Sequence, residues 1–167
     1  MKALLAITAA LLAAAPLVAQ TAPERSAQPV VEVIASADAF FAALRSDDKT
    51  ALSRQMIADR IIIVTDRMDP AQPRETSIPV AKHLENWAKS PQGLDEHMIY
   101  RSVILLGDTA LVSGPYRFLA NGKTTHCGTN MLMFEQTESG WKLGDTSFTM
   151  EPPSECERLG APAAPAQ

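Results

Sequence analysis

Residues 110–150 read ALVSGPYRFLANGKTTHCGTNMLMFEQTESGWKLGDTSFTM, and this segment carries the strongest fold signal in the chain. It is typical of three strands, Ala110–Leu119, Lys123–Gln136 and Trp141–Met150, joined by two tight turns. The dipeptide Asn121-Gly122 is a strong hairpin signal, because both residues tolerate the positive φ that a type I′ turn requires. The segment therefore predicts two consecutive β-hairpins, and we expect any binding site to be built on them.

The residues before these hairpins predict three helical segments. Asp48 is placed to cap a short second helix, Lys49–Met56, and Ser77 is placed to cap a third helix with Pro79 in its first turn. The first helix is expected to begin at Pro29 and to run for about 17 residues, because apolar residues recur there at three- and four-residue steps. The apolar positions are Val30, Val33, Ile34, Ala37, Phe40, Phe41 and Leu44.

Two further strands are expected outside the hairpins. The segment Ala58–Thr65 contains the β-branched run Ile61–Val64, which favours a strand because branching at Cβ restricts χ1 in a helix. Charged residues and two prolines in Asp66–Thr76 predict an exposed connection. The segment Glu96–Leu106, which ends at a Gly107-Asp108 turn, is expected to join the sheet.

Composition limits the number of domains and the class of partner. The chain has 167 residues, of which 46% are hydrophobic, which is enough for one domain with a core. The formal net charge is −4, and lysines and arginines are scattered along the chain. Since nucleic acids are bound by clustered positive charge, we do not expect a nucleic-acid partner.

The first residues have the pattern of a secretory signal peptide. Met1-Lys2 precedes the apolar run Ala3–Ala15, which is followed by Pro16-Leu17-Val18-Ala19, so residues 1–19 are expected to be removed by cleavage after Ala19, with cleavage after Ala22 as the alternative. The apolar run is short for a membrane-spanning helix, although an uncleaved anchor is an alternative. We therefore expect an exported protein, periplasmic or secreted, with no stable membrane span after cleavage.

Composition also predicts the remaining boundaries. Residues 20–28 carry proline, serine and glutamine without an apolar period and are expected to form a flexible lead-in. Residues 29–156 are expected to form the folded domain. The low-complexity residues 157–167 are expected to be a disordered tail.

The two cysteines, Cys127 and Cys156, predict one disulfide in an exported chain. It would close a loop of about 30 residues and stabilise the fold by about 3 kcal/mol. Two free thiols and a metal pair are the alternatives. The neighbours His126 and Cys127 lack zinc-finger spacing, and His83 and His97 add no short ligand motif, so we predict no metal and no cofactor.

The predicted order of helices and strands is typical of an α+β fold in which a curved antiparallel sheet wraps around three N-terminal helical segments. This order resembles the nuclear transport factor 2 (NTF2)-like superfamily. The resemblance covers Val30–Cys156 and implies the cone-shaped fold that SnoaL-like polyketide cyclases, ketosteroid isomerase and scytalone dehydratase share. Local strings resemble exported bacterial members of the SnoaL-like or lumazine-binding type: they are Gly114–Phe118, Asn121–Lys123, His126–Gly128, Gly140–Leu143, Phe148-Thr149 and Cys156.

The resemblance implies a fold rather than a reaction, because this fold hosts enzymes, binding proteins and immunity proteins. The general base and oxyanion hole of the isomerase do not map onto this sequence by motif. The Asp-His set of the dehydratase does not map either.

Three side chains are candidates for acid-base chemistry. His126 lies on a strand, with a reference pKa near neutrality, and is a candidate general base; a purely local structural role is the alternative. Asp145 shares strand parity with Trp141, so it is expected to face inward as a base; a solvent-exposed position near the mouth is the alternative. Tyr116 shares parity with Phe118 and could orient a carbonyl; a core tyrosine is the alternative.

The two turns make conflicting predictions about which residues face inward. A two-residue Asn-Gly turn pairs Tyr116 with Cys127 and turns Cys127 inward. A two-residue turn at Glu138-Ser139 instead turns His126 and Asn130 inward together with Trp141. The two pairings cannot both hold along one strand unless it contains a bulge or one of the turns is longer, because a slip of one residue exchanges the faces of a strand. We expect the second arrangement.

These observations favour an exported small-molecule-binding domain. Its ligand would be a small hydrophobic or carbonyl-containing molecule, bound in a cone by Val112, Tyr116, Phe118, Asn130, Trp141 and Trp87. The alternative is a SnoaL-like enzyme of isomerase, cyclase or dehydratase type, with His126 or Asp145 as the base and Tyr116 as the oxyanion donor. A third interpretation is a domain that forms a homodimer through the sheet.

Overall fold

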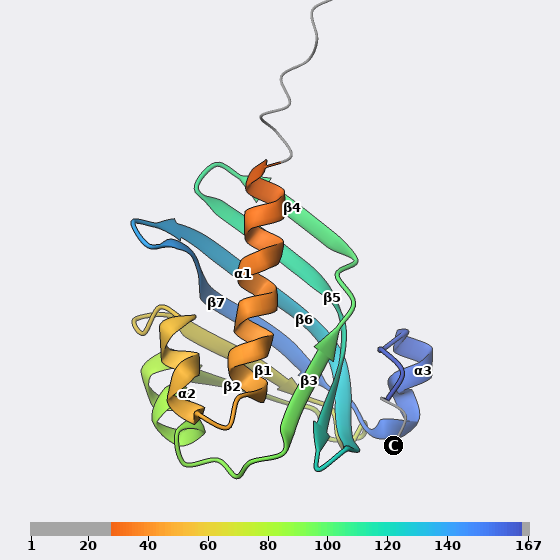
Figure 1. Ribbon diagram of the computed structural model, residues 1–167. Helices are drawn as coiled ribbons and strands as arrows, with labels where there is room; N and C mark the ends of the chain where they lie inside the picture. The colour runs from red at the N-terminus through yellow and green to blue at the C-terminus, as the bar shows by residue number, and fades with distance from the viewer. Residues whose placement is uncertain (1–27, 165–167) are drawn as a thin grey trace, which may run out of the picture.

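The computed structural model of the chain describes residues 28–164, which form one curved sheet and the helices packed on it (Figure 1). The expected signal peptide and most of the lead-in lie outside the described residues. No helix within residues 28–164 is long and apolar enough to cross a membrane. In chain order the elements are α1 (Gln28–Arg45), the 3₁₀ helix η2 (Lys49–Arg54), β1 (Ile61–Asp66), β2 (Arg74–Pro79), α2 (Val80–Trp87), β3 (Leu94–Met98), β4 (Ser102–Leu106), β5 (Thr109–Ala120), β6 (Lys123–Thr137), β7 (Gly140–Met150), the 3₁₀ helix η3 (Pro153–Glu155) and α3 (Cys156–Leu159).

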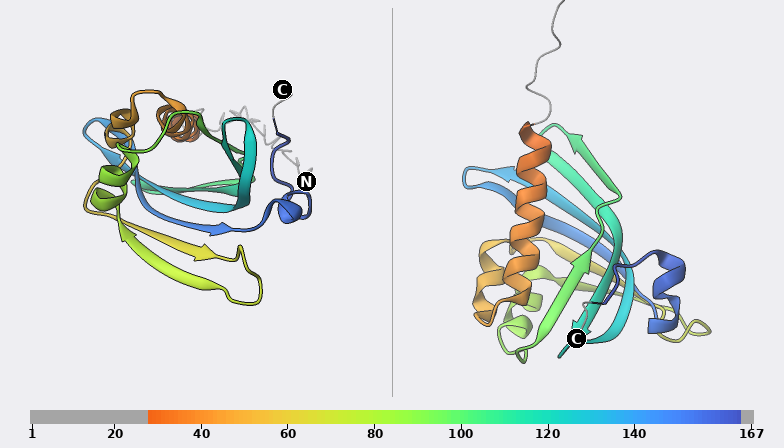
Figure 2. Two further views of the ribbon diagram at one scale, coloured as in Figure 1. Left: turned by 90° about the horizontal axis from the view of Figure 1, so that it is seen from below. Right: turned by 45° about the vertical axis from the view of Figure 1, so that its right-hand side comes forward.

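The sheet has seven strands in the order β2-β1-β7-β6-β5-β3, and β4 pairs with β5 next to β3. All paired strands are antiparallel except β1 and β7, which are parallel, so the sheet is mixed rather than wholly antiparallel. The parallel pair is possible because the whole chain between these strands serves as the crossover. Figure 2 shows the sheet curving around one side of the molecule, with α1 and α2 on its concave side and α3 outside it. This is the expected cone-shaped α+β arrangement.

The hydrophobic core lies between the helices and the concave face of the sheet. The predicted apolar face of α1 is confirmed, because Val33, Ala37 and Phe40 are buried. Asp48 caps η2 as expected, and its carboxylate accepts a hydrogen bond from the Thr50 amide at 3.0 Å. The sheet buries Ile62, Val64, Ala110, Val112, Leu132, Phe134, Trp141 and Leu143 against these helices.

The edge strand β2 was not expected. Residues Arg74–Pro79 pair with β1, where the sequence predicts an exposed connection and a helix cap at Ser77. Ser77 instead lies opposite Ile63, and the helix begins at Val80. Every residue of β2 except Ile78 is exposed, so no apolar alternation marks the strand, and backbone pairing with β1 defines it.

The expected strand Glu96–Leu106 is divided into β3 and β4. The residues between them still contact β5, because the Ile99 amide donates to the Pro115 carbonyl at 3.0 Å. A Cβ atom at Gly114 would lie 1.9 Å from the Ile99 carbonyl oxygen. Glycine at this position therefore permits the close approach at which the strand breaks.

The two hairpins form as predicted, and two bulges reconcile their registers. Asn121 and Gly122 have φ angles of 50° and 75°, as a type I′ turn requires. One register shift follows the Phe118–His126 pair, and a second lies between Leu132 and Phe134. Because each bulge exchanges the faces of a strand, His126 turns to the concave side as expected.

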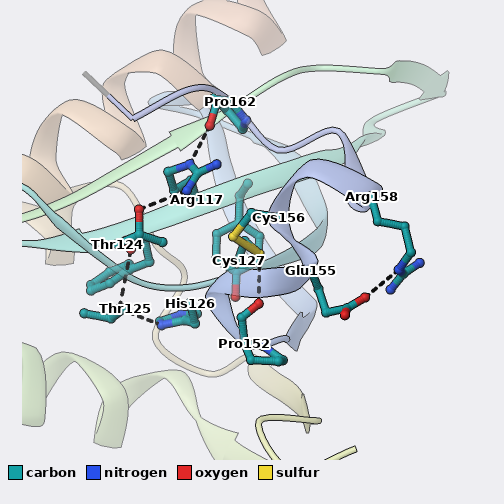
Figure 3. The surroundings of a disulfide bond; sticks show 12 residues. Arg117, Thr124, Thr125, His126, Cys127, Pro152, Glu155, Cys156, Arg158 and Pro162 are labelled. Atoms are coloured by element: carbon teal, nitrogen blue, oxygen red, sulfur yellow. Dashed lines mark hydrogen bonds and ion pairs between the residues drawn. A yellow bond between two sulfur atoms is a disulfide. The ribbon is translucent and has the colours of Figure 1, made fainter. Parts of the chain in front are cut away.

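A disulfide between Cys127 and Cys156 ties the C-terminal segment to the convex face of β6, with 5.5 Å between the two Cα atoms (Figure 3). The Arg117 side chain donates to the Pro162 carbonyl at 2.5 Å. Residues 157–164, expected to belong to a disordered tail, are therefore placed against the sheet by a covalent bond and a hydrogen bond. The expectation of disorder is wrong for this part of the tail.

Candidate functional site

The helices and the concave face of the sheet enclose a cavity of about 180 Å³. A cavity of about 150 Å³ with apolar walls can hold benzene, so this one suits a single ring with a short substituent. Most of its wall is aliphatic or aromatic. The lining residues are Phe40, Leu44, Met56, Ile62, His83, Trp87, Glu96, Tyr116, Phe118, His126, Asn130, Leu132, Leu143, Thr146, Phe148 and Met150.

Glu96 supplies the one carboxyl group that the described part of the chain brings to the cavity wall. This residue lies on β3 opposite Phe118 and is only 9% exposed. Its Oε1 atom accepts a hydrogen bond from Asn130 Nδ2 at 2.7 Å, which is the only hydrogen bond to its side chain within residues 28–164. Burial raises the pKa of Glu96 to about 7, because the charged form loses its hydration. The carboxyl group can therefore either donate or accept a proton near neutral pH.

Arg45 on α1 lies beside Glu96, but its guanidinium forms an ion pair with Asp95. Arg45 donates to the Glu96 backbone carbonyl at 3.1 Å, and its guanidinium lies 3.7 Å from the Asp95 carboxylate. Asp95 also contacts His97 at 2.7 Å. The Glu96 side chain itself is therefore held by the neutral amide of Asn130 and by no cation among the described residues.

His126 lies in a group of aromatic rings beside the cavity. Its ring stacks on Phe118, with 5.0 Å between the centroids, and meets Tyr116 edge to face at 5.7 Å. Its Nδ1 atom lies 2.9 Å from the Thr125 hydroxyl (Figure 3). Burial lowers the pKa of His126 to about 4, so the imidazole is neutral near pH 7.

Tyr116 lines the cavity, but its hydroxyl proton is already engaged. The hydroxyl donates to the Thr149 carbonyl at 2.7 Å, and the residue is 2% exposed. Burial raises the pKa of Tyr116, and the negative charges of Glu96 and Glu151 raise it further. This geometry favours a wall residue over the oxyanion donor that the sequence suggested.

Asp145 does not face the cavity, contrary to its predicted parity. The bulge in β7 places two residues, Gly144 and Asp145, where β6 has one. The inward-facing residues of β7 are therefore odd-numbered up to Leu143 and even-numbered from Thr146 onward. Asp145 is exposed and accepts a hydrogen bond from the Ile61 amide at 2.9 Å. The structure therefore brings His126 and Tyr116 to one cavity and leaves Asp145 outside it.

The expected ligand-binding residues divide into two groups. Trp87, Phe118 and Asn130 line the cavity. Val112 and Trp141 are buried in the core and are not part of the cavity wall.

Sequence reasoning missed three polar lining residues. Glu96 shares one face of β3 with Leu94 and Met98, and a carboxylate on this otherwise apolar face was a readable signal. His83 lies four residues before Trp87 on α2, and the two rings stack with 5.9 Å between their centroids. Thr146 reaches the cavity only because of the bulge in β7, which no local pattern indicates.

Hydrogen-bonding capacity remains unused in the cavity wall. The Trp87 indole nitrogen and the Thr146 hydroxyl are buried without a hydrogen-bond partner in the described part of the chain. A buried polar group without a partner costs about 1–3 kcal/mol. In residues 28–164 no group of three or more His, Cys, Asp and Glu side chains is arranged to hold a metal ion.

Solved structures share this fold. An NTF2-like protein of unknown function from Shewanella baltica has 10% sequence identity and a TM-score of 0.57, and the match covers 76% of this chain and 97% of that one. An NTF2-like protein from Shewanella oneidensis has 13% sequence identity and a TM-score of 0.57, and the match covers 72% of this chain and 98% of that one. A candidate dehydratase of the NTF2-like family from Streptomyces avermitilis has 20% sequence identity and a TM-score of 0.54, and the match covers 74% of this chain and 96% of that one.

These likenesses establish that the fold is NTF2-like. No protein-family model matches the sequence, and a comparison with curated proteins finds no significant match. The site must therefore be interpreted from its own geometry.

Proposed function

We propose that this domain binds a compact, largely apolar organic molecule in the cavity between α1, α2 and the concave face of the sheet. The observation that carries the proposal is the cavity itself, about 180 Å³ with a mostly apolar wall and few polar groups. Small-molecule sites typically combine a preformed apolar pocket with a small number of placed polar groups. Several lining residues, among them His83, His126 and Phe148, are partly exposed, which gives a guest a route from solvent.

The polar groups lie directly beside aromatic rings in the cavity wall. Glu96 is paired with Phe118 across β3 and β5, and Asn130 is paired with Phe148 across β6 and β7. A ring with one polar substituent would therefore find a hydrogen-bonding group and aromatic neighbours in the same part of the cavity.

A cavity-filling substitution tests this proposal. Phenethyl alcohol, a neutral single-ring probe, is expected to bind saturably in calorimetric titration, and Leu132→Phe is expected to abolish binding because the larger side chain fills the cavity. Met133→Phe is the matched control, because Met133 follows Leu132 on β6 and is 41% exposed on the opposite face. Overpacking costs about 1–3 kcal/mol, so circular dichroism and thermal melting would verify that both variants fold. Unchanged binding by Leu132→Phe, or equal loss in both variants, would contradict the proposal.

Acid-base catalysis on a carbonyl compound is a second candidate function, favoured by the pKa of about 7 for the buried Glu96. In this role the Glu96 carboxylate would take a proton from the carbon next to the carbonyl, and the resulting enolate would take one back. The experiment is to incubate the protein with phenylacetone in D₂O and to follow deuterium incorporation by nuclear magnetic resonance. Exchange that is faster than in buffer and is lost in Glu96→Gln would support catalysis, and exchange at the buffer rate would contradict it.

We also propose that the protein is exported before it functions. The signal-like residues 1–19 support this proposal, and so does the disulfide, since disulfides persist in oxidising compartments. Cell fractionation followed by N-terminal sequencing tests it. A mature protein that begins after Ala19 or Ala22 in the exported fraction is expected, and an uncleaved cytosolic protein would contradict it.

Self-association through the sheet is a further proposal, supported by the convex face. Its exposed side chains Ile104 on β4 and Met133 on β6 lie on either side of the half-buried Leu111 of β5, which pairs with both. Met131 and Ile63 continue the apolar surface across Ser147 of β7. Such a surface suits an isologous contact with a second copy of the chain.

A further inference from the structure

We infer that the guest of the cavity is an organic ammonium ion, a protonated amine on a short aromatic or aliphatic skeleton, whose nitrogen binds the Glu96 carboxylate. This inference rests on the proposed function and names its ligand class. It is argued from the charge, the hydrogen-bonding groups and the aromatic rings of the cavity.

The charge balance of the cavity favours a cation. Among the lining side chains that residues 28–164 supply, Glu96 is the only acid, and none is a lysine or an arginine. Arg45 forms its ion pair with Asp95, and Lys49 lies over the Trp87 ring, 5.5 Å from its centroid, and donates to the Leu44 carbonyl. A buried charge is stable only when it is paired, so a cationic guest would supply the partner that the described residues do not.

The hydrogen-bonding groups beside Glu96 also match an ammonium ion. The only hydrogen bond within residues 28–164 that joins these two side chains runs from Asn130 Nδ2 to Glu96 Oε1, so the Oε2 atom of Glu96 and the Oδ1 atom of Asn130 remain acceptors that a guest could use. An alkylammonium group has three donors and no acceptor. A guest carboxylate has the opposite composition and would place two negative charges together.

Aromatic rings complete the site. Besides Trp87, whose ring is already covered by Lys49 and His83, the side chains of Tyr116, Phe118 and Phe148 line the cavity, and Tyr116 and Phe148 meet edge to face at 6.1 Å. The faces of aromatic rings attract ammonium groups, and aromatic cages are a common way to bind them. The same rings would hold the apolar skeleton of the guest.

The titratable groups around Glu96 set the pH dependence of binding. Burial lowers the pKa of His83 and of His126, and burial raises the pKa of Tyr116, so all three are neutral in the cavity near pH 7. The other titratable and charged groups on the elements around Glu96 include Asp95 and His97 on β3, Arg45 on α1 and Lys49 on η2. With a Glu96 pKa of about 7, the ionised fraction rises about tenfold between pH 6 and pH 8.

Three probes with similar skeletons test the inference: phenethylamine (cationic), phenethyl alcohol (neutral) and phenylacetate (anionic). At pH 8 we expect calorimetry to show phenethylamine binding at least tenfold more tightly than phenethyl alcohol, with phenylacetate weakest. Phenethylamine affinity should rise about tenfold from pH 6 to pH 8, because alkyl amines stay protonated over this range while Glu96 ionises. Glu96→Gln should remove the preference for the amine and keep the binding of the alcohol.

Asp145→Asn is the matched control, because it removes an exposed carboxylate outside the cavity and should keep the preference for the amine. Equal affinity for phenethylamine and phenethyl alcohol, or a preference that persists in Glu96→Gln, would overturn the inference and leave the proposed function standing. The absence of saturable binding by all three probes would contradict the proposed function as well.

Discussion

Replacement of Glu96 by glutamine should change how the stability of the fold depends on pH. The carboxyl pKa rises from 4.5 in the unfolded chain to about 7 in the folded protein, because the group is buried in the cavity wall. A raised carboxyl pKa contributes stability that is fully present below about pH 4.5 and is lost as the pH rises through 7. At about 1.4 kcal/mol for each pH unit, the whole shift corresponds to about 3 kcal/mol.

Glutamine keeps the size of the side chain and the acceptor for Asn130 but does not ionise. The difference in unfolding free energy between Glu96→Gln and the wild type should therefore grow in favour of the variant by about 2–3 kcal/mol from pH 5 to pH 8. Urea denaturation followed by circular dichroism measures this difference at each pH. Asp145→Asn should show no comparable growth, because its carboxylate is exposed. Parallel pH profiles for Glu96→Gln and the wild type would refute the reasoning.

Three further predictions concern the disulfide, the imidazole and the convex face. The double variant Cys127→Ala/Cys156→Ala should lose about 3–4 kcal/mol of unfolding free energy, and an unchanged urea midpoint would contradict a stabilising crosslink. The His126 ring resonances should not titrate between pH 8 and pH 5, because the pKa is about 4, whereas a midpoint near the reference value of 6.5 would show a solvated ring. The wild-type protein should sediment as a dimer and Met133→Glu as a monomer, since Met133 lies on the exposed convex face; a monomeric wild type would argue against this contact.

The parts of the fold that local rules govern were predictable from the sequence. The Asn121-Gly122 turn fixed the central hairpin, because few other dipeptides tolerate two positive φ angles. The apolar period of α1 located its buried face, and Asp48 located the start of η2. In each case the signal and the structure that it predicts lie within a few residues of each other.

The parts that depend on pairing between strands were not predictable in the same way. Asp145 faces outward because the bulge in β7 opposes two residues to one on β6, and strand parity alone cannot locate a bulge. The edge strand β2 is exposed along most of its length, so pairing with β1 defines it rather than an apolar pattern. Glu96 was readable from the sequence, because it shares one face of β3 with the apolar residues Leu94 and Met98.

The most direct test of the account is to find where phenethylamine contacts the protein in solution. In a nuclear magnetic resonance titration, we expect saturable shifts and nuclear Overhauser contacts between the probe ring and the methyl groups of Ile62, Leu132 and Leu143, which line the cavity. Contacts with Met131 and Met133 on the convex face, or no saturable shift at any residue, would contradict a binding site between the helices and the concave sheet.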